Sequence, residues 1–214
     1  FPQVMPLARS AKFSLLSLLG MTLLVLLTTP ANSGAKTLTP PGNKVYFGTA
    51  GAAVHVVEPE TKTYRESVLV DLYDAGRIVD NCDHIHFYQR PLTARDMITG
   101  HDLDINTMYA CIAGTQKHVG TSMVEPTPVT ECLDILHFIA GGEEKWRERP
   151  FVSQSNCFVV PPMKFAEDAC RCLEVAARGG MPVLLLSAAQ AGATSPAALA
   201  GTVGTGNIVG VAVA

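Results

Sequence analysis

Residues 182–187 read PVLLLS, an aliphatic run that lies between Gly179-Gly180 and the small residues that follow it. A strand with one solvated face alternates apolar and polar residues, whereas a strand covered on both faces is apolar along its length. A strand of the second kind is typical of a parallel sheet flanked by helices. The run therefore predicts an α/β fold.

Strand and helix patterns alternate along the rest of the chain, at a spacing of about 30 residues. Strands are expected at residues 84–89, 118–124, 151–160 and 182–187, and helices at about 67–80, 102–115, 127–140 and 164–178. This rhythm is typical of a (β/α) barrel or of a doubly wound sheet. The predicted fold class is α/β, a partial (β/α)8 TIM barrel of about four βα units, preceded by a small β-hairpin formed by residues 44–48 and 53–57.

Capping residues predict where the helices begin and end. Ser67 is expected to cap the first helix with its hydroxyl group. Thr127 is expected to cap the third, with Pro128 at the first helical position. Gly141-Gly142 is the expected stop of that helix, because glycine adopts the left-handed conformation that ends many helices.

The first 42 residues differ from the rest, since they contain no acidic residue and are expected to lie outside the fold. Residues 13–27 (FSLLSLLGMTLLVLL) carry no charge and would span about 22 Å as a helix, short of a roughly 30 Å hydrocarbon core. The segment resembles a signal peptide, which would imply export or membrane anchoring. The alternative is that a shifted reading frame produced this segment and that the protein is cytoplasmic.

Composition excludes several classes of protein. A net charge of -3 gives no electrostatic reason to expect nucleic acid as a partner. The six cysteines contain no CxxC pair, which argues against a structural zinc site. Reduced thiols in the cytoplasm are the simplest interpretation.

Three local patterns could carry chemistry, each with a structural alternative. His84 and His86 share a strand face and could bind a metal in a hydrolase barrel, but they begin their strand, whereas barrel sites use the far end. Cys170 and Cys172 would face different sides of a helix and are expected to be structural. Residues 153–157 (SQSNC) form a polar patch that either lines a pocket or satisfies a strand end.

The charged residues 143–149 (EEKWRER) follow the predicted stop of the third helix. They are expected to form a solvated turn with i,i+4 ion pairs such as Glu143 with Arg147.

Several motifs together resemble the trimethylamine methyltransferase family. They are Gly141-Gly142, residues 146–150 (WRERP), residues 161–163 (PPM), residues 192–201 (GATSPAALAG) and residues 45–48 (VYFG). The resemblance covers about residues 43–203 and implies a (β/α)8 barrel that moves a methyl group from a methylated amine, trimethylamine or glycine betaine, to the cobalt of a corrinoid. It also implies a separate corrinoid protein as partner, one-carbon metabolism as in methanogenesis, and no cofactor held tightly by this chain.

The resemblance leaves the catalytic residues unassigned, but strand ends suggest a substrate pocket. Its predicted members are Tyr88, Ser122, Asn156, Ser187, Gln190 and Thr194. Aromatic rings are the expected way to hold a methylated cation. Tyr88 shares the strand face of His84 and His86 and is expected to face the site, so Phe87 is expected to pack against helices. No metal ligand is predicted.

Both ends depart from the family pattern, so the predicted domains are residues 1–42, residues 43–203 and a non-family tail of residues 204–214. The chain is expected to be a fragment, inactive alone, of a homo-oligomeric parent. Two alternatives stay open: an exported α/β binding protein or hydrolase, and a metal-dependent hydrolase that uses His84 and His86.

Overall fold

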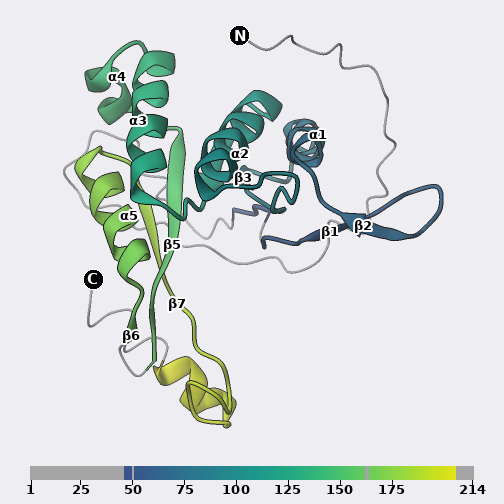
Figure 1. The fold of residues 1–214 in the computed structure, drawn as a ribbon, viewed down its shortest axis with the longest axis vertical. Helices are drawn as coiled ribbons and strands as arrows, with labels where there is room; N and C mark the ends of the chain where they lie inside the picture. The colour runs from purple at the N-terminus through teal and green to yellow at the C-terminus, as the bar shows by residue number, and fades with distance from the viewer. Residues whose placement is uncertain (1–45, 50, 162–163, 206–214) are drawn as a thin grey trace.

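The computed structural model describes residues 46–49, 51–161 and 164–205 of the chain, and it has a mixed α/β architecture (Figure 1). Its elements are β1 (His55–Val57), β2 (Tyr64–Glu66), α1 (Leu69–Asp80), β3 (Phe87–Gln89), α2 (Gly100–Gly114), β4 (His118–Thr121), α3 (Pro126–Ala140), α4 (Glu143–Glu148), β5 (Val152–Val160), β6 (Lys164–Phe165), α5 (Glu167–Arg178) and β7 (Val183–Ser187). No helix of these described residues is long and apolar enough to cross a membrane. The apolar residues 13–27 lie outside them.

The main sheet is built from parallel strands in chain order. β3 pairs with β4, β4 with β5 and β5 with β7, all in parallel, while the short β6 is antiparallel to the end of β5. Gly48 makes a single parallel bridge to Phe87 on the other edge of β3. Each new parallel strand is therefore added to the same edge of the sheet, whereas β6 pairs with the other edge of β5.

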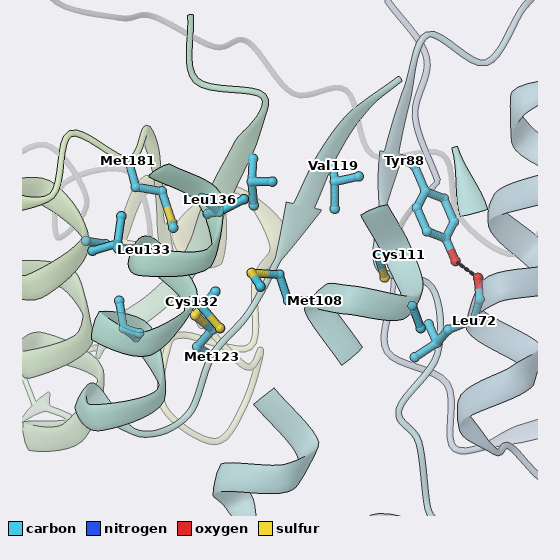
Figure 2. Close-up of a cluster of buried hydrophobic side chains, with 14 of the residues drawn as sticks. Leu72, Tyr88, Met108, Cys111, Val119, Met123, Cys132, Leu133, Leu136 and Met181 are labelled. Atoms are coloured by element: carbon cyan, nitrogen blue, oxygen red, sulfur yellow. Dashed lines mark hydrogen bonds between the residues drawn. The ribbon is translucent and has the colours of Figure 1, made fainter. Parts of the chain in front are cut away.

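The helices form one layer against one face of this sheet. Right-handed crossovers that all step in the same direction place their helices on the same side. Tyr88, Val119 and Val152 from neighbouring strands share a buried cluster with Leu72 of α1, and with side chains of α2, α3 and α5 (Figure 2). A doubly wound sheet would place helices on both faces. Among the described strands, β3, β4, β5 and β7 follow one another across the sheet in chain order, without a reversal.

The run that indicated a parallel sheet forms β7, and its parallel pairing is confirmed. Its burial is lower than predicted. The strand is half-buried and Leu185 is 37% exposed, because β7 is the last strand of the described sheet.

The predicted hairpin is wrong in its pairing. His55–Val57 pairs antiparallel with Tyr64–Glu66, across a turn in which Lys62 has φ 59°. Arg65 on this hairpin forms ion pairs with Glu58 and with the buried Asp71 of α1. Gly48 belongs beside β3 instead, since its neighbour there is the ring of Phe87.

Two predicted helix caps are also wrong, although the helices are present. The N-cap of α1 is Val68, whose N–H is accepted by the Asp71 carboxylate, and the Ser67 hydroxyl donates to the Thr93 carbonyl. The N-cap of α3 is Glu125, so Thr127 lies inside the helix. The Asp104 carboxylate of α2 accepts the N–H groups of Val124 and Glu125, the two residues that precede α3, and so fixes the point at which this helix begins.

Gly141 ends α3 as predicted, with φ 83°. The charged residues after it form the helix α4 rather than a turn, and the predicted Glu143–Arg147 ion pair is present at 2.9 Å. The helix predicted from residue 164 begins only at Glu167, because Lys164–Phe165 pairs with β5.

Helix α4 is attached to the end of α5 by its own side chains. Trp146 is fully buried, its Nε1 donates to the Gly179 carbonyl at 2.9 Å, and its ring meets Phe151 edge-on at 5.3 Å. Arg147 Nη2 donates to the Arg178 carbonyl at 2.9 Å. Two side chains of the WRERP motif therefore donate hydrogen bonds to backbone carbonyls at the carboxyl end of α5.

We predict that Trp146→Phe lowers the free energy of unfolding by about 1–2 kcal/mol, because it removes one hydrogen bond and part of the packing, and that Trp146→Ala lowers it by about 3–5 kcal/mol. Phe138→Ala is the control, since Phe138 is 87% exposed, and should change stability by less than about 0.5 kcal/mol. Urea unfolding followed by circular dichroism measures all three. Wild-type stability in Trp146→Ala would contradict the prediction.

Candidate functional site

The strands of the sheet separate two sets of side chains. Successive residues of a strand point to opposite faces, and Tyr88, Val119 and Val152 point to the helices. The alternate residues therefore lie on the opposite face, which we call the inner face. In β3, β4 and the first half of β5 they are Phe87, Gln89, His118, Gly120, Ser153 and Ser155.

A hydrogen bond crosses β4 on the inner face. Gln89 Nε2 on β3 donates to Ser155 Oγ on β5 at 2.9 Å, so the side chain passes over the intervening strand. Gly120 of β4 makes this crossing possible, because a Cβ atom there would collide with the Gln89 amide. The three residues connect three strands through one polar contact.

His118 and Ser153 form a second inner-face pair. The imidazole Nε2 and the Ser153 Oγ are hydrogen-bonded at 2.9 Å. Burial lowers the pKa of His118 from 6.5 to about 4, because the charged imidazolium loses its hydration. His118 is therefore neutral at physiological pH.

The polar groups of the inner face are hydroxyl, amide and neutral imidazole. They can donate and accept hydrogen bonds without bringing a charge to a bound molecule. Ser153 and Ser155 are buried, whereas Cys157, next in the same alternation, is exposed. The series Ser153, Ser155 and Cys157 runs toward the carboxyl end of β5. In parallel α/β folds, sites form at the carboxyl ends of the strands.

Two of the predicted pocket residues lie on the helix face. The Tyr88 hydroxyl is buried and donates to the Leu72 carbonyl of α1 at 2.6 Å (Figure 2). The expectation that Tyr88 faces the site while Phe87 packs against helices is therefore wrong. Asn156 Nδ2 donates to the Ala169 carbonyl of α5 at 2.8 Å, which also directs it toward the helices.

The other four predicted residues follow or end strands. Gln190 and Thr194 are brought together, since the Gln190 N–H donates to Thr194 Oγ1 at 3.0 Å in a turn closed on itself. Ser187 ends β7 and Ser122 directly follows β4. Among the described residues no hydrogen bond joins these four to Tyr88 or Asn156, and the pocket as a whole stays a prediction.

The histidine pair is not arranged as a metal site. His84 lies in the turn before β3, and His86 Nδ1 accepts the Phe47 N–H at 3.0 Å. Within the described parts of the chain, no group of three or more His, Cys, Asp or Glu side chains could hold a metal ion. All six cysteines are free thiols, with Cys172 buried and Cys170 partly exposed.

Sequence reasoning missed Gln89, His118 and Gly120, and it did not decide the role of the SQSNC patch. The alternation within that patch was a usable signal, because Ser153, Ser155 and Cys157 must share one face. Which of the two faces they occupy depends on contacts with distant helices, so the sequence could not assign it.

The fold and this site define an α/β protein of consecutive βα units with a neutral polar inner face. A family model described as trimethylamine methyltransferase (MTTB) matches residues 25–208. The chain belongs to this family. The matched range begins before residue 43 and ends beyond residue 203, and the predicted domain boundaries stay predictions.

Curated relatives have the same description. A trimethylamine methyltransferase of Desulfitobacterium hafniense is 31% identical over 166 residues, which cover 78% of this chain and 33% of the relative. One from Methanosarcina mazei is 30% identical over 174 residues, 80% of this chain and 35% of the relative. The chain spans about a third of the length of the curated relatives that it matches.

The low pKa of His118 predicts a pH-dependent stability. The folded-state pKa of about 4 lies below the ordinary value of 6.5, so between these values the unfolded chain binds more protons. The stability present above about pH 6.5 is therefore lost as the pH falls toward 4. Urea midpoints measured across this range should fall less steeply for His118→Gln than for the wild type. His55→Gln, at an exposed position, is the control and should keep the wild-type slope.

Gly120→Ala tests the crossing of Gln89. The added methyl group should displace the Gln89 side chain and lower the free energy of unfolding by about 1–3 kcal/mol, as overpacking does. In the background Gln89→Ala the same substitution should cost less, because the colliding side chain is gone. Urea unfolding of the four proteins gives this double-mutant cycle. Additive effects would show that Gln89 does not lie over Gly120.

Proposed function

We propose that this chain forms consecutive βα units of a (β/α)8 barrel methyltransferase. That enzyme transfers a methyl group from trimethylamine, or from a quaternary amine such as glycine betaine, to a corrinoid carried by a partner protein. The observation that carries the proposal is the family membership of residues 25–208. The relatives are described as trimethylamine methyltransferases, and the activity is a proposal for this chain because it spans about a third of their length.

The winding of the sheet supports the barrel. In a doubly wound fold the strand order reverses, and the two directions place helices on both faces. Here β3, β4, β5 and β7 follow in chain order with one layer of helices, which is the progression of a barrel. Residues that continue this progression would close the sheet and enclose the inner face.

The inner face fits a role in holding a methylated amine. The partner's reduced corrinoid would supply the nucleophile that takes the methyl group. A positive charge on the substrate nitrogen makes that nitrogen a better leaving group. No inner-face side chain of β3, β4 or the first half of β5 is acidic, so these residues would orient the substrate without neutralising it.

The proposed substrate contacts are the residues at the carboxyl ends of the strands. Ser122, Ser187, Gln190 and Thr194 belong to this group, and Gln89 and Ser155 extend it along the inner face. Asn156 would not contact the substrate but would fix the position of β5 against α5 through its hydrogen bond to the Ala169 carbonyl.

A reducing compartment, and so the cytoplasm, is proposed as the location. Burial raises the pKa of the Cys111 and Cys132 thiols to about 12, which makes them unreactive as thiolates. Titration of the denatured protein, purified without reductant, should find six free thiols.

Methyl transfer tests the proposed function directly. The longest reading frame that contains this chain should methylate a cob(I)alamin acceptor when trimethylamine or glycine betaine is added, as followed by the cobalamin absorbance spectrum under anaerobic conditions. Gln89→Ala should lower the rate by about tenfold, the effect of one lost hydrogen bond of about 1.4 kcal/mol.

Phe138→Ala is the matched control and should keep the wild-type rate, because the side chain is exposed on α3. The 214-residue chain alone should be inactive. Lack of amine-dependent methylation by the longer protein with either substrate would contradict the proposed activity. Full activity of the chain alone would contradict the barrel.

A further inference from the structure

A polar layer lies above the apolar core, at the carboxyl end of the sheet and on its helix face. Tyr88, Val119 and Val152 form the apolar layer. The next position of the same alternation is Arg90 after β3 and Thr121 in β4. Arg90 extends the ladder by donating its N–H to the Gly120 carbonyl at 2.8 Å, so its side chain lies beside that of Thr121.

Helix α2 faces this layer with two polar side chains. Asp104 and Thr107 are one turn apart on the buried side of the helix. Burial lowers the pKa of the Arg90 guanidinium and raises that of the Asp104 carboxyl, and the opposite charge of each group partly offsets the shift of the other. Arg90 is 8% exposed, and Asp104, Thr107 and Thr121 are 1%, 0% and 1% exposed.

Each of these four side chains has a buried polar atom without a hydrogen-bond partner among the described residues. The atoms are Arg90 Nη1, Asp104 Oδ1, Thr107 Oγ1 and Thr121 Oγ1. A single buried unpaired polar group is costly, and four on facing elements indicate a shared occupant. We call this group of four side chains the Arg90–Asp104 chamber.

The chemistry of the four atoms selects the occupant. Arg90 and Asp104 carry opposite charges, so the chamber is neutral overall. A cation would be repelled by the guanidinium, and an anion by the carboxylate. Water donates to a carboxylate, accepts from a guanidinium and can do both with hydroxyl groups. Buried water typically makes about three hydrogen bonds of this kind.

We propose that the Arg90–Asp104 chamber binds one or two ordered water molecules that join Arg90 to Asp104 and to the hydroxyl groups of Thr107 and Thr121. This hydration site lies on the helix face and is separate from the inner-face groups proposed to hold substrate.

The bound water would position the loop that carries Ser122. Asp104 Oδ2 accepts the N–H groups of Val124 and Glu125 at 2.8 and 3.1 Å. Gln154 bonds both the N–H and the carbonyl of Met123 at 3.1 Å. Two buried side chains, Asp104 and Gln154, thus form hydrogen bonds with the backbone of the loop between β4 and α3. Water that fixes Oδ1 of Asp104 also fixes the orientation of Oδ2 toward this loop.

Thr107→Val and Thr121→Val distinguish bound water from unpaired hydroxyl groups by the sign of their effect. Valine keeps the shape of threonine but cannot hydrogen-bond to water. If water is bound, each substitution removes one of its partners, and the urea midpoint should fall. If the hydroxyl groups are truly unpaired, their removal relieves a penalty and the midpoint should rise, which would overturn the proposal.

Thr130→Val is the matched control, because Thr130 is exposed in α3 and the same substitution there should leave the urea midpoint nearly unchanged. A crystal structure of the chain at about 1.5 Å resolution gives a second test that needs no variant. It should show a water peak within hydrogen-bonding distance of Arg90 Nη1 and Asp104 Oδ1. A direct Arg90–Asp104 ion pair, or a metal ion in the chamber, would overturn the proposal.

Discussion

The parallel pairing of β3, β4 and β5 in chain order is the constraint on which the rest of the structure depends. Because every crossover steps in the same direction, the helices must all cover one face of the sheet. Because the register is fixed, Tyr88, Val119 and Val152 meet on that face and form the centre of the core. The same register places Gln89, Gly120 and Ser155 on the opposite face, where one polar side chain crosses a whole strand.

The two faces use polar groups differently. On the inner face the groups are neutral and pair with one another, as in the contacts of Gln89 with Ser155 and of His118 with Ser153. On the helix face, above the apolar layer, Arg90 and Asp104 are charged and buried, and no hydrogen bond joins Arg90 Nη1 or Asp104 Oδ1 to another described residue. Buried charges require compensation, which is why a bridging solvent is expected there and not on the inner face.

One of the motifs that resemble the family, residues 146–150 (WRERP), has a structural role in the described residues. Trp146 and Arg147 bond the carbonyls of Gly179 and Arg178, and so attach α4 to the end of α5. Gly180 at this junction has φ 72°, a conformation that few other residues adopt. These contacts are between parts of the fold, so they carry no information about which side chains contact a substrate.

By itself the sequence determined the α/β class, the existence of α1, α2, α3, α5 and the parallel strand β7, because helical periodicity and aliphatic runs are local properties. It also determined the end of α3 at Gly141, since a left-handed residue stops a helix wherever it occurs. Only the tertiary structure decided that His55–Val57 pairs with Tyr64–Glu66 and that Tyr88 rather than Phe87 faces the helices. It also decided that Asp104 of α2 accepts a hydrogen bond from the loop before α3. The physical reason is that strands of three or four residues are too short to show which face is buried. That choice depends on contacts between segments far apart in the chain.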